Sequence, residues 1–173
     1  MKIDKINYRK IFKFATLLLT AMLIATVSAA TYKYMYIDGS VTISTTTGLK
    51  WVEGTDAPSG TSIAGSTVTL PLTAQNGTPT NFTYCLYLQN LDASDHPVVI
   101  NITSAANSTL YDEFNLMIFN NSTEAHIDTL IVTTTDSYSG TITSSTVWRL
   151  TFEVSAKASS SGSDTFDVQF RYE

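Results

Sequence analysis

Two segments in the last third of the chain alternate strictly between apolar and polar residues, and this pattern limits the fold more than any other feature. In the first segment Trp148, Leu150, Phe152 and Val154 alternate with Arg149, Thr151 and Glu153, and in the second Phe166, Val168, Phe170 and Tyr172 alternate with Asp167, Gln169, Arg171 and Glu173. Successive side chains of a β-strand point to opposite faces, so a period of two gathers the apolar residues on one face. We therefore expect two strands that each bury one face against a second sheet.

Weaker versions of this alternation recur upstream. The candidate inward-facing sets are Val68, Leu70 and Leu72; Phe82, Tyr84, Leu86 and Leu88; Val98, Ile100 and Ile102; and Phe114, Leu116 and Ile118, followed by a strand within 127–133. A further apolar stretch holds Leu49, Trp51 and Val52. Segments rich in Gly, Pro, Ser and Asp separate these stretches, and they predict a loop over 53–66 and a turn over 136–140, with Ile142 as a candidate for a short strand after the turn. The pattern predicts an all-β fold of the jelly-roll-like β-sandwich class, with eight or nine strands in one domain over 45–173.

The residue types agree with a β-rich fold rather than with a disordered chain. The sequence contains 28 threonines, and 11% of its residues are aromatic. Threonine is β-branched and suits the outer face of a strand, whereas a disordered chain is poor in aromatic residues.

The first thirty residues have the order of a secretory signal peptide. Residues 1–13 are basic, residues 14–27 are apolar, and the small residues Ser28, Ala29 and Ala30 follow. The apolar run is short for a membrane span, which needs about 20 residues. We expect cleavage after Ala29 or Ala30 and a secreted chain with no stable membrane span; the alternative is an uncleaved N-terminal anchor.

The segment 31–44, which follows the predicted signal peptide at 1–30, is predicted to be an extended, aromatic strand. Within its first part, Tyr32, Tyr34 and Tyr36 alternate with Lys33, Met35 and Ile37. Both faces are largely apolar or amphipathic, so we expect both to contact protein. Such a strand needs a partner sheet, which belongs either to the same subunit or to the next one.

Loss of the signal peptide makes the chain more acidic. The full sequence has a net charge of −5, whereas residues 31–173 hold five Lys and Arg against fourteen Asp and Glu, a net charge of −9. Nucleic acids and anionic lipids attract basic surfaces. We therefore expect neither as a partner.

No residue pattern indicates catalysis. His96 and His126 are the only histidines, and neither has a Cys or His at metal-ligand spacing. Acidic residues near the turns, such as Asp92 and Asp95, match no known calcium motif, and no nucleophile elbow or phosphate-binding loop is present. The single cysteine, Cys85, is expected to be buried, with an intermolecular disulfide as the alternative. We expect no enzyme, no metal site and no cofactor.

Six Asn-x-Ser/Thr sequons are spread along the chain. They begin at Asn76, Asn81, Asn101, Asn107, Asn120 and Asn121. Most of them lie at predicted loops or strand edges, where a glycan can be accommodated. In a secreted chain this pattern predicts a glycoprotein.

The order of these features resembles a known family. A secretory signal ends just before an aromatic strand, and a Thr-rich domain closes on the segments WRLTFEV and FDVQFRY. This resembles the bacterial TasA/camelysin biofilm-fibre subunits, and more closely the related archaeal bundling-pilus and cannula subunits.

The resemblance implies an extracellular, cell-surface filament (a pilus or biofilm fibre) assembled head-to-tail by donor-strand complementation. The donor strand would be Thr31, Tyr32, Lys33, Tyr34, Met35, Tyr36 and Ile37. Partners would be copies of the same chain, with neighbouring filaments as a further contact. Cannula subunits would also imply calcium at the interfaces, for which no matching ligand set is evident. The alternative function is a secreted binding module that captures a carbohydrate or a cell-surface protein through Trp51, Tyr87 or Tyr111.

Overall fold

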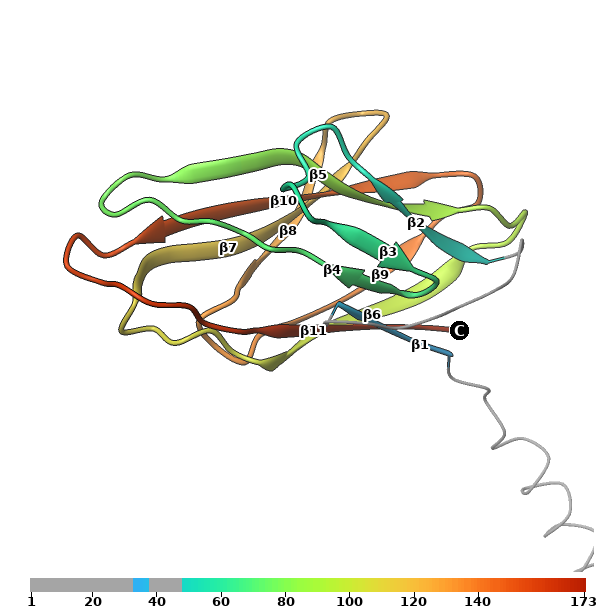
Figure 1. Cartoon of the computed structure of the whole chain (residues 1–173). Helices are drawn as coiled ribbons and strands as arrows, with labels where there is room; N and C mark the ends of the chain where they lie inside the picture. The colour runs from blue at the N-terminus through green and yellow to red at the C-terminus, as the bar shows by residue number, and fades with distance from the viewer. Residues whose placement is uncertain (1–32, 38–47) are drawn as a thin grey trace, which may run out of the picture. The chain divides into compact units, whose positions relative to one another are not determined.

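The computed structural model describes residues 33–37 and 48–173, and these ranges consist of strands joined by turns and loops (Figure 1). The strands are β1 (Lys33–Ile37), β2 (Leu49–Glu53), β3 (Ser62–Ala64), β4 (Thr67–Thr69), β5 (Thr80–Asn90), β6 (His96–Ser104), β7 (Tyr111–Asn120), β8 (His126–Ile131), β9 (Ser137–Ile142), β10 (Val147–Ala156) and β11 (Asp167–Tyr172). The described ranges hold no helix long and apolar enough to cross a membrane. The predicted signal peptide, Thr31, Tyr32 and residues 38–47 lie outside the described residues.

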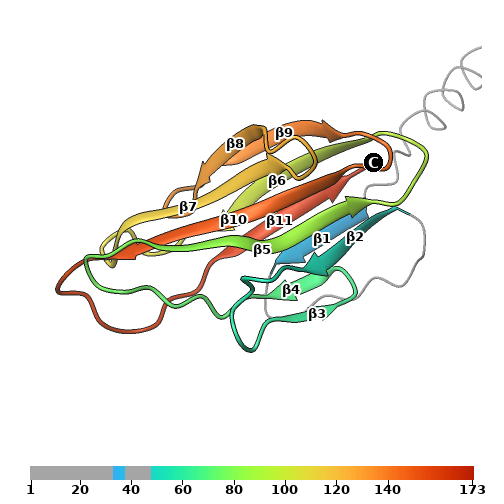
Figure 2. The same cartoon turned by 90° about the horizontal axis from the view of Figure 1, so that it is seen from above.

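The strands form two sheets that pack face to face, so the predicted β-sandwich is confirmed. One sheet has the order β3-β4-β1-β11-β6-β9 and the other the order β2-β5-β10-β7-β8 (Figure 1, Figure 2). If β1, β2 and β3 are set aside, eight strands remain in two facing four-stranded sheets, β4-β11-β6-β9 and β5-β10-β7-β8. From β4 onward the chain crosses between the sheets at every connection except β7 to β8, which is the arrangement of an eight-stranded jelly roll.

The core lies between the sheets and is built from the predicted inward residues of the closing strands. Leu150 and Phe152 of β10 and Val168 and Phe170 of β11 are buried, as predicted. The sheets also meet through aromatic pairs, such as Tyr138 of β9 against Trp148 of β10, with ring centroids 5.9 Å apart. Each large apolar side chain contributes about 1.5–3 kcal/mol when fully buried.

Two segments that were predicted to be irregular form strands instead. Residues 137–142 form β9, which pairs with the edge of β6, although a turn was predicted over 136–140. Similarly, β3 lies inside the predicted loop 53–66 and pairs with β4. Both strands are rich in Ser, Thr, Ala or Gly and lie at a sheet edge, where main-chain pairing needs few apolar side chains. Their sequences therefore lack the alternation that identified the other strands.

One residue of β5 faces the opposite way from the prediction. Tyr84 was grouped with Leu86 and Leu88, but 40% of its surface is exposed while Cys85 is buried. The register between β5 and β10 shifts between Leu150 and Phe152, because extra residues of β5 bulge there. The bulge disturbs the alternation only within residues 83–85, so Tyr84 turns outward and Cys85 inward, and Phe82 beyond it packs against the core again.

Two aromatic rings on the outer face of the β2-β5-β10-β7-β8 sheet cover a charged residue. Arg149 was predicted to face outward, and it does so, yet only 5% of its surface is exposed. Its guanidinium lies 4.8 Å from the ring centroids of both Tyr84 and Phe119, and it pairs with Glu124. Cation–π contacts of this kind compensate in part for the loss of water around the charge.

Replacing Leu150 or Val168 by Asp should destabilise the domain by about 3 kcal/mol or more, because a carboxylate would enter apolar surroundings. Thr141 of β9 is exposed, and Thr141→Asp is the matched control, with an expected change within about 0.5 kcal/mol. Urea unfolding followed by tryptophan fluorescence measures all three variants. Equal stability of the Leu150 and Thr141 variants would contradict the assignment of the faces.

Candidate functional site

The candidate site is the slot between β4 and β11, which in this chain is filled by β1 (Figure 2). In the eight-stranded order given above, β4 and β11 would be neighbours. Here β1 separates them: it pairs antiparallel with β11 and parallel with β4. The strand nearest the N-terminal end is therefore an insertion into the middle of a sheet rather than an addition to its edge.

The main chain of β1 is held mainly by β11. Five pairs join the two strands, from Lys33 opposite Tyr172 to Ile37 opposite Val168. Only one pair, Tyr36 with Thr67, joins β1 to β4. The other edge of β11 pairs along β6, so β11 is a fixed wall of the slot. One wall of the slot is therefore the last strand of the chain.

Trp51 forms the floor of the slot and links its two walls. It belongs to β2 of the opposite sheet and is 2% exposed. Its ring packs edge-on against Phe170 of β11, with centroids 4.8 Å apart. Its indole Nε1 donates a hydrogen bond of 3.0 Å to the main-chain oxygen of Ser66, directly before β4. One side chain thus fixes the spacing into which β1 fits.

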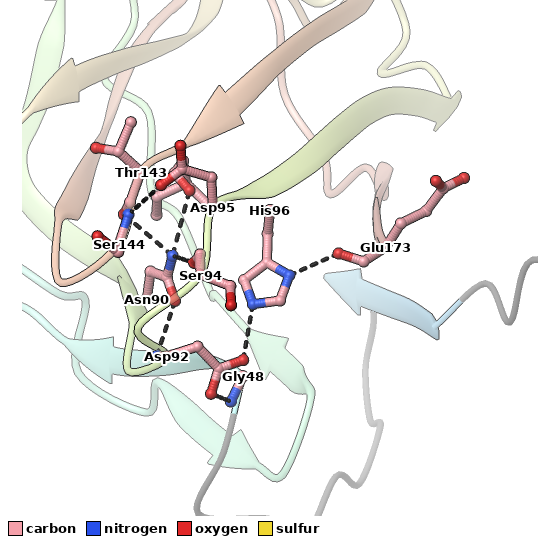
Figure 3. A network of polar contacts seen from close by, with 10 residues as sticks. Gly48, Asn90, Asp92, Ser94, Asp95, His96, Thr143, Ser144 and Glu173 are labelled. Atoms are coloured by element: carbon pink, nitrogen blue, oxygen red, sulfur yellow. Dashed lines mark hydrogen bonds and ion pairs between the residues drawn. The ribbon is translucent and has the colours of Figure 1, made fainter.

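A polar cluster closes the end of the slot at which Lys33 pairs with Tyr172 (Figure 3). The His96 ring lies 2.6 Å (Nδ1) from the main-chain oxygen of Glu173 and 2.7 Å (Nε2) from Oδ2 of Asp92. The other oxygen of Asp92 accepts a 2.8 Å hydrogen bond from the main-chain nitrogen of Gly48. The cluster therefore connects the end of β11, the β5–β6 turn and the start of β2.

Gly48 is required at this position by its conformation and its neighbour. Its φ is +100°, which side-chain-bearing residues rarely adopt, and an added Cβ would lie 3.2 Å from the Tyr172 hydroxyl. That hydroxyl bonds the main chain of Leu49, and burial is the largest cause of a raised Tyr172 pKa. The first described residue after 38–47 is thus packed directly against β11.

The turn that carries Asp92 is itself braced by a buried amide. The Asn90 side chain donates to the main-chain oxygens of Ser94, Ile142 and Thr143, and its Oδ1 accepts from the Asp92 nitrogen (Figure 3). These bonds join the β5–β6 turn to the β9–β10 turn. They brace the turn from which the Asp92 side chain projects.

The sequons differ in how their side chains are used. Asn76, Asn81 and Asn107 are exposed, whereas Asn101, Asn120 and Asn121 are partly buried. The Asn76 amide nitrogen donates to the main-chain oxygens of Ala158 (3.3 Å) and Ser160 (2.9 Å). In contrast, Asn107 uses its amide oxygen, which accepts from the nitrogen and the hydroxyl of Thr109.

The side chains proposed for the alternative binding function do not form one surface. Trp51 is buried in the slot floor, and Tyr87 lies on β5 of the sheet opposite β11. Tyr111 lines a pocket of about 360 Å³ at the loops around Asn76 and Asp164. Burial and then the Asp164 charge raise the Tyr111 pKa. Across 33–37 and 48–173, no group of three or more His, Cys, Asp or Glu side chains is placed to hold a metal ion.

The comparisons with known proteins add no family assignment. No protein-family model matches the chain, and no curated protein matches it significantly.

The Cys85 thiol should be inert in the folded protein. Burial, followed by the charges of Asp56 and Glu53, raises its pKa from 9.0 to about 12. We expect almost no alkylation by iodoacetamide at pH 8 in buffer and rapid alkylation in urea, because the thiolate is the reactive form. Disulfide-linked dimers on a non-reducing gel would contradict this.

The same shift makes the folded state less stable at alkaline pH. The unfolded thiol loses its proton near pH 9.0, while the folded thiol keeps it to about pH 12. Its contribution is therefore complete below pH 9 and declines as the pH rises further. A Cys85→Ala variant should lose less stability between pH 9 and pH 11 than the parent chain.

Proposed function

We propose that this chain is the subunit of an extracellular filament in which β1 of one copy fills the slot between β4 and β11 of the next. The observation that carries the proposal is the position of β1. It pairs in the middle of a sheet, yet it is joined to β2 only through residues 38–48. Its contacts with β11 are main-chain pairs that the same strand of another copy can make.

The connection allows either arrangement. Eleven residues reach up to about 36 Å when extended. β1 can therefore fill the slot of its own chain, which gives a closed monomer, or the slot of a neighbour. A contact between two different surfaces of the same protein is head-to-tail and propagates when it does not close into a ring.

The slot also explains why a secreted subunit needs a strand in place at all times. Without β1, five residues of β11 would lose their main-chain partners on this edge. Exposed edges of this kind associate indiscriminately. Strand addition supplies main-chain hydrogen bonds for affinity and side-chain pockets for specificity. A strand exchanged between copies keeps the slot filled before and after assembly.

A cysteine pair across the slot tests the proposal. Tyr36 lies opposite Gln169, and opposite residues of antiparallel strands are close enough for a disulfide. In a Cys85→Ala background, oxidised filaments of Tyr36→Cys/Gln169→Cys should run as a ladder of covalent multimers on a non-reducing gel. Monomers of the same variant should give a closed single chain.

Two variants serve as controls for the ladder. Gln169→Cys alone should give no multimers beyond a dimer. Deletion of residues 31–37 should give monomers that form no filaments in electron micrographs. Filaments whose cysteines pair only within each chain would show that β1 fills the slot of its own chain, and this result would refute the exchange.

We also propose that the filament is glycosylated, with unequal use of its sequons. A glycan replaces one of the two hydrogens on an asparagine amide nitrogen. At Asn76 this would remove one of two hydrogen bonds to the 158–160 loop, whereas the contacts of Asn107 use its oxygen. Glycopeptide mass spectrometry of secreted protein should find Asn107 occupied and Asn76 largely bare. Full occupancy at Asn76 would contradict this ranking, and an intact mass equal to the bare polypeptide would remove the proposal.

A further inference from the structure

The His96 ring lies between two groups that can only accept hydrogen bonds. The main-chain oxygen of Glu173 faces Nδ1 at 2.6 Å, and Oδ2 of Asp92 faces Nε2 at 2.7 Å. A neutral imidazole carries one N–H and can satisfy only one of them, whereas the protonated ring donates to both. The neutral ring would therefore oppose a nitrogen lone pair to an oxygen at one of the two contacts.

We propose that His96 is a pH-sensitive latch on the slot, closed when the ring is protonated and loosened when it is neutral. The inference rests on the filament function proposed above, because it names what controls exchange of β1. The supporting geometry is the position of the cluster at the end of the slot where Lys33, the first residue of β1, pairs with Tyr172.

The latch acts on both structures that retain β1. Glu173 directly follows Tyr172, the residue of β11 that pairs with Lys33 at the beginning of β1. On the other side, Asp92 holds the nitrogen of Gly48, whose oxygen accepts from the nitrogen of Leu91. Gly48 follows the segment that leaves β1. Loosening His96 thus weakens the β11 wall and the anchor of the connecting segment at the same time.

Titratable groups adjoin the ring from several elements. They are Asp92, its sequence neighbour Asp95, Tyr172 and Glu173, and Lys33 begins the strand that pairs with Tyr172. Asp95 uses its carboxylate to bind the nitrogen of Ser144 in the β9–β10 turn. Tyr172 meets the imidazole edge-on, with ring centroids 5.6 Å apart. The Asp92 carboxylate contacts both the ring and the main-chain nitrogen of Gly48.

The direction of the pH effect follows from these partners. The ring that donates to both oxygens carries the extra proton, so the latch is more complete at mildly acidic than at alkaline pH. Loss of that proton removes one charge-assisted contact. We expect β1 to exchange about ten- to a hundredfold faster at pH 8 than at pH 5.5, in keeping with the usual strength of a hydrogen bond to a charged group.

Strand exchange by a labelled peptide measures this effect. The secreted protein is mixed with a peptide of residues 31–37 that carries fluorescein on its N-terminus. The label blocks the α-amino group, which would otherwise change its charge between pH 5.5 and pH 8. The dye itself is the same in every sample that is compared. The rate of incorporation is followed by size exclusion, so changes of dye emission do not enter. Wild-type protein should incorporate the peptide more slowly at pH 5.5 than at pH 8.

The two histidines provide a matched pair of variants. In His96→Gln the rate should be fast and equal at both pH values, because the amide does not titrate. His126 lies on β8 of the other sheet, where it contacts the Thr129 hydroxyl. His126→Gln should therefore behave like wild type. An equal pH effect in wild type and His96→Gln would overturn the latch.

A second measurement separates the latch from the filament function. Amide hydrogen exchange of residues 33–37 in the intact chain, divided by the rate in the isolated peptide, reports opening of β1 without any exchange between copies. A peptide that never enters the slot would refute donor-strand exchange. In that case, greater protection at pH 5.5 in wild type but not in His96→Gln would still support the latch, and equal protection would overturn it.

Discussion

The main-chain pairing of β11 on both of its edges is the constraint on which the rest of the sandwich depends. One edge is permanently matched by β6, and the other is matched by β1. Every buried N–H and C=O group needs a partner, so the second edge must always hold a strand. Main-chain groups do not distinguish one copy of a chain from another. The same bonds that complete the fold of one molecule are therefore those that would join two molecules.

The slot is kept in shape by contacts that do not involve β1. Trp51 spans from Phe170 to the main chain before β4 and fixes the distance between the walls. At one end, His96 and Asp92 fasten the end of β11 to the start of β2. A preformed receptor of this kind lowers the entropic cost of binding a strand, since only the strand has to become ordered. In the proposed filament, the receptor remains the same whichever copy supplies β1.

The sequence predicted those parts of the fold in which apolar and polar residues alternate. In β11 and the central parts of β5, β6 and β7 burial follows this alternation, because one face of each meets the core. In β10 the residue types alternate in the same way, although Arg149 and Thr151 on its other face are also buried. Residues 137–142 could not be recognised, since β9 contributes little more than Ile142 to the core and is held by its pairing with β6. Tyr84 was assigned to the wrong face because a bulge depends on the strand opposite, which no local pattern reveals.

The sequence by itself determined that this chain forms a β-sandwich with an aromatic strand ahead of it, because hydrophobic alternation is a local property. Only the tertiary structure decided that β1 lies between β4 and β11, that Trp51 is the floor beneath it, and that His96 meets Asp92 and Glu173. Those residues are separated by up to about 140 positions along the chain and are brought together by strand order. Strand order is set by the packing of whole sheets, which the pattern of any single strand does not encode.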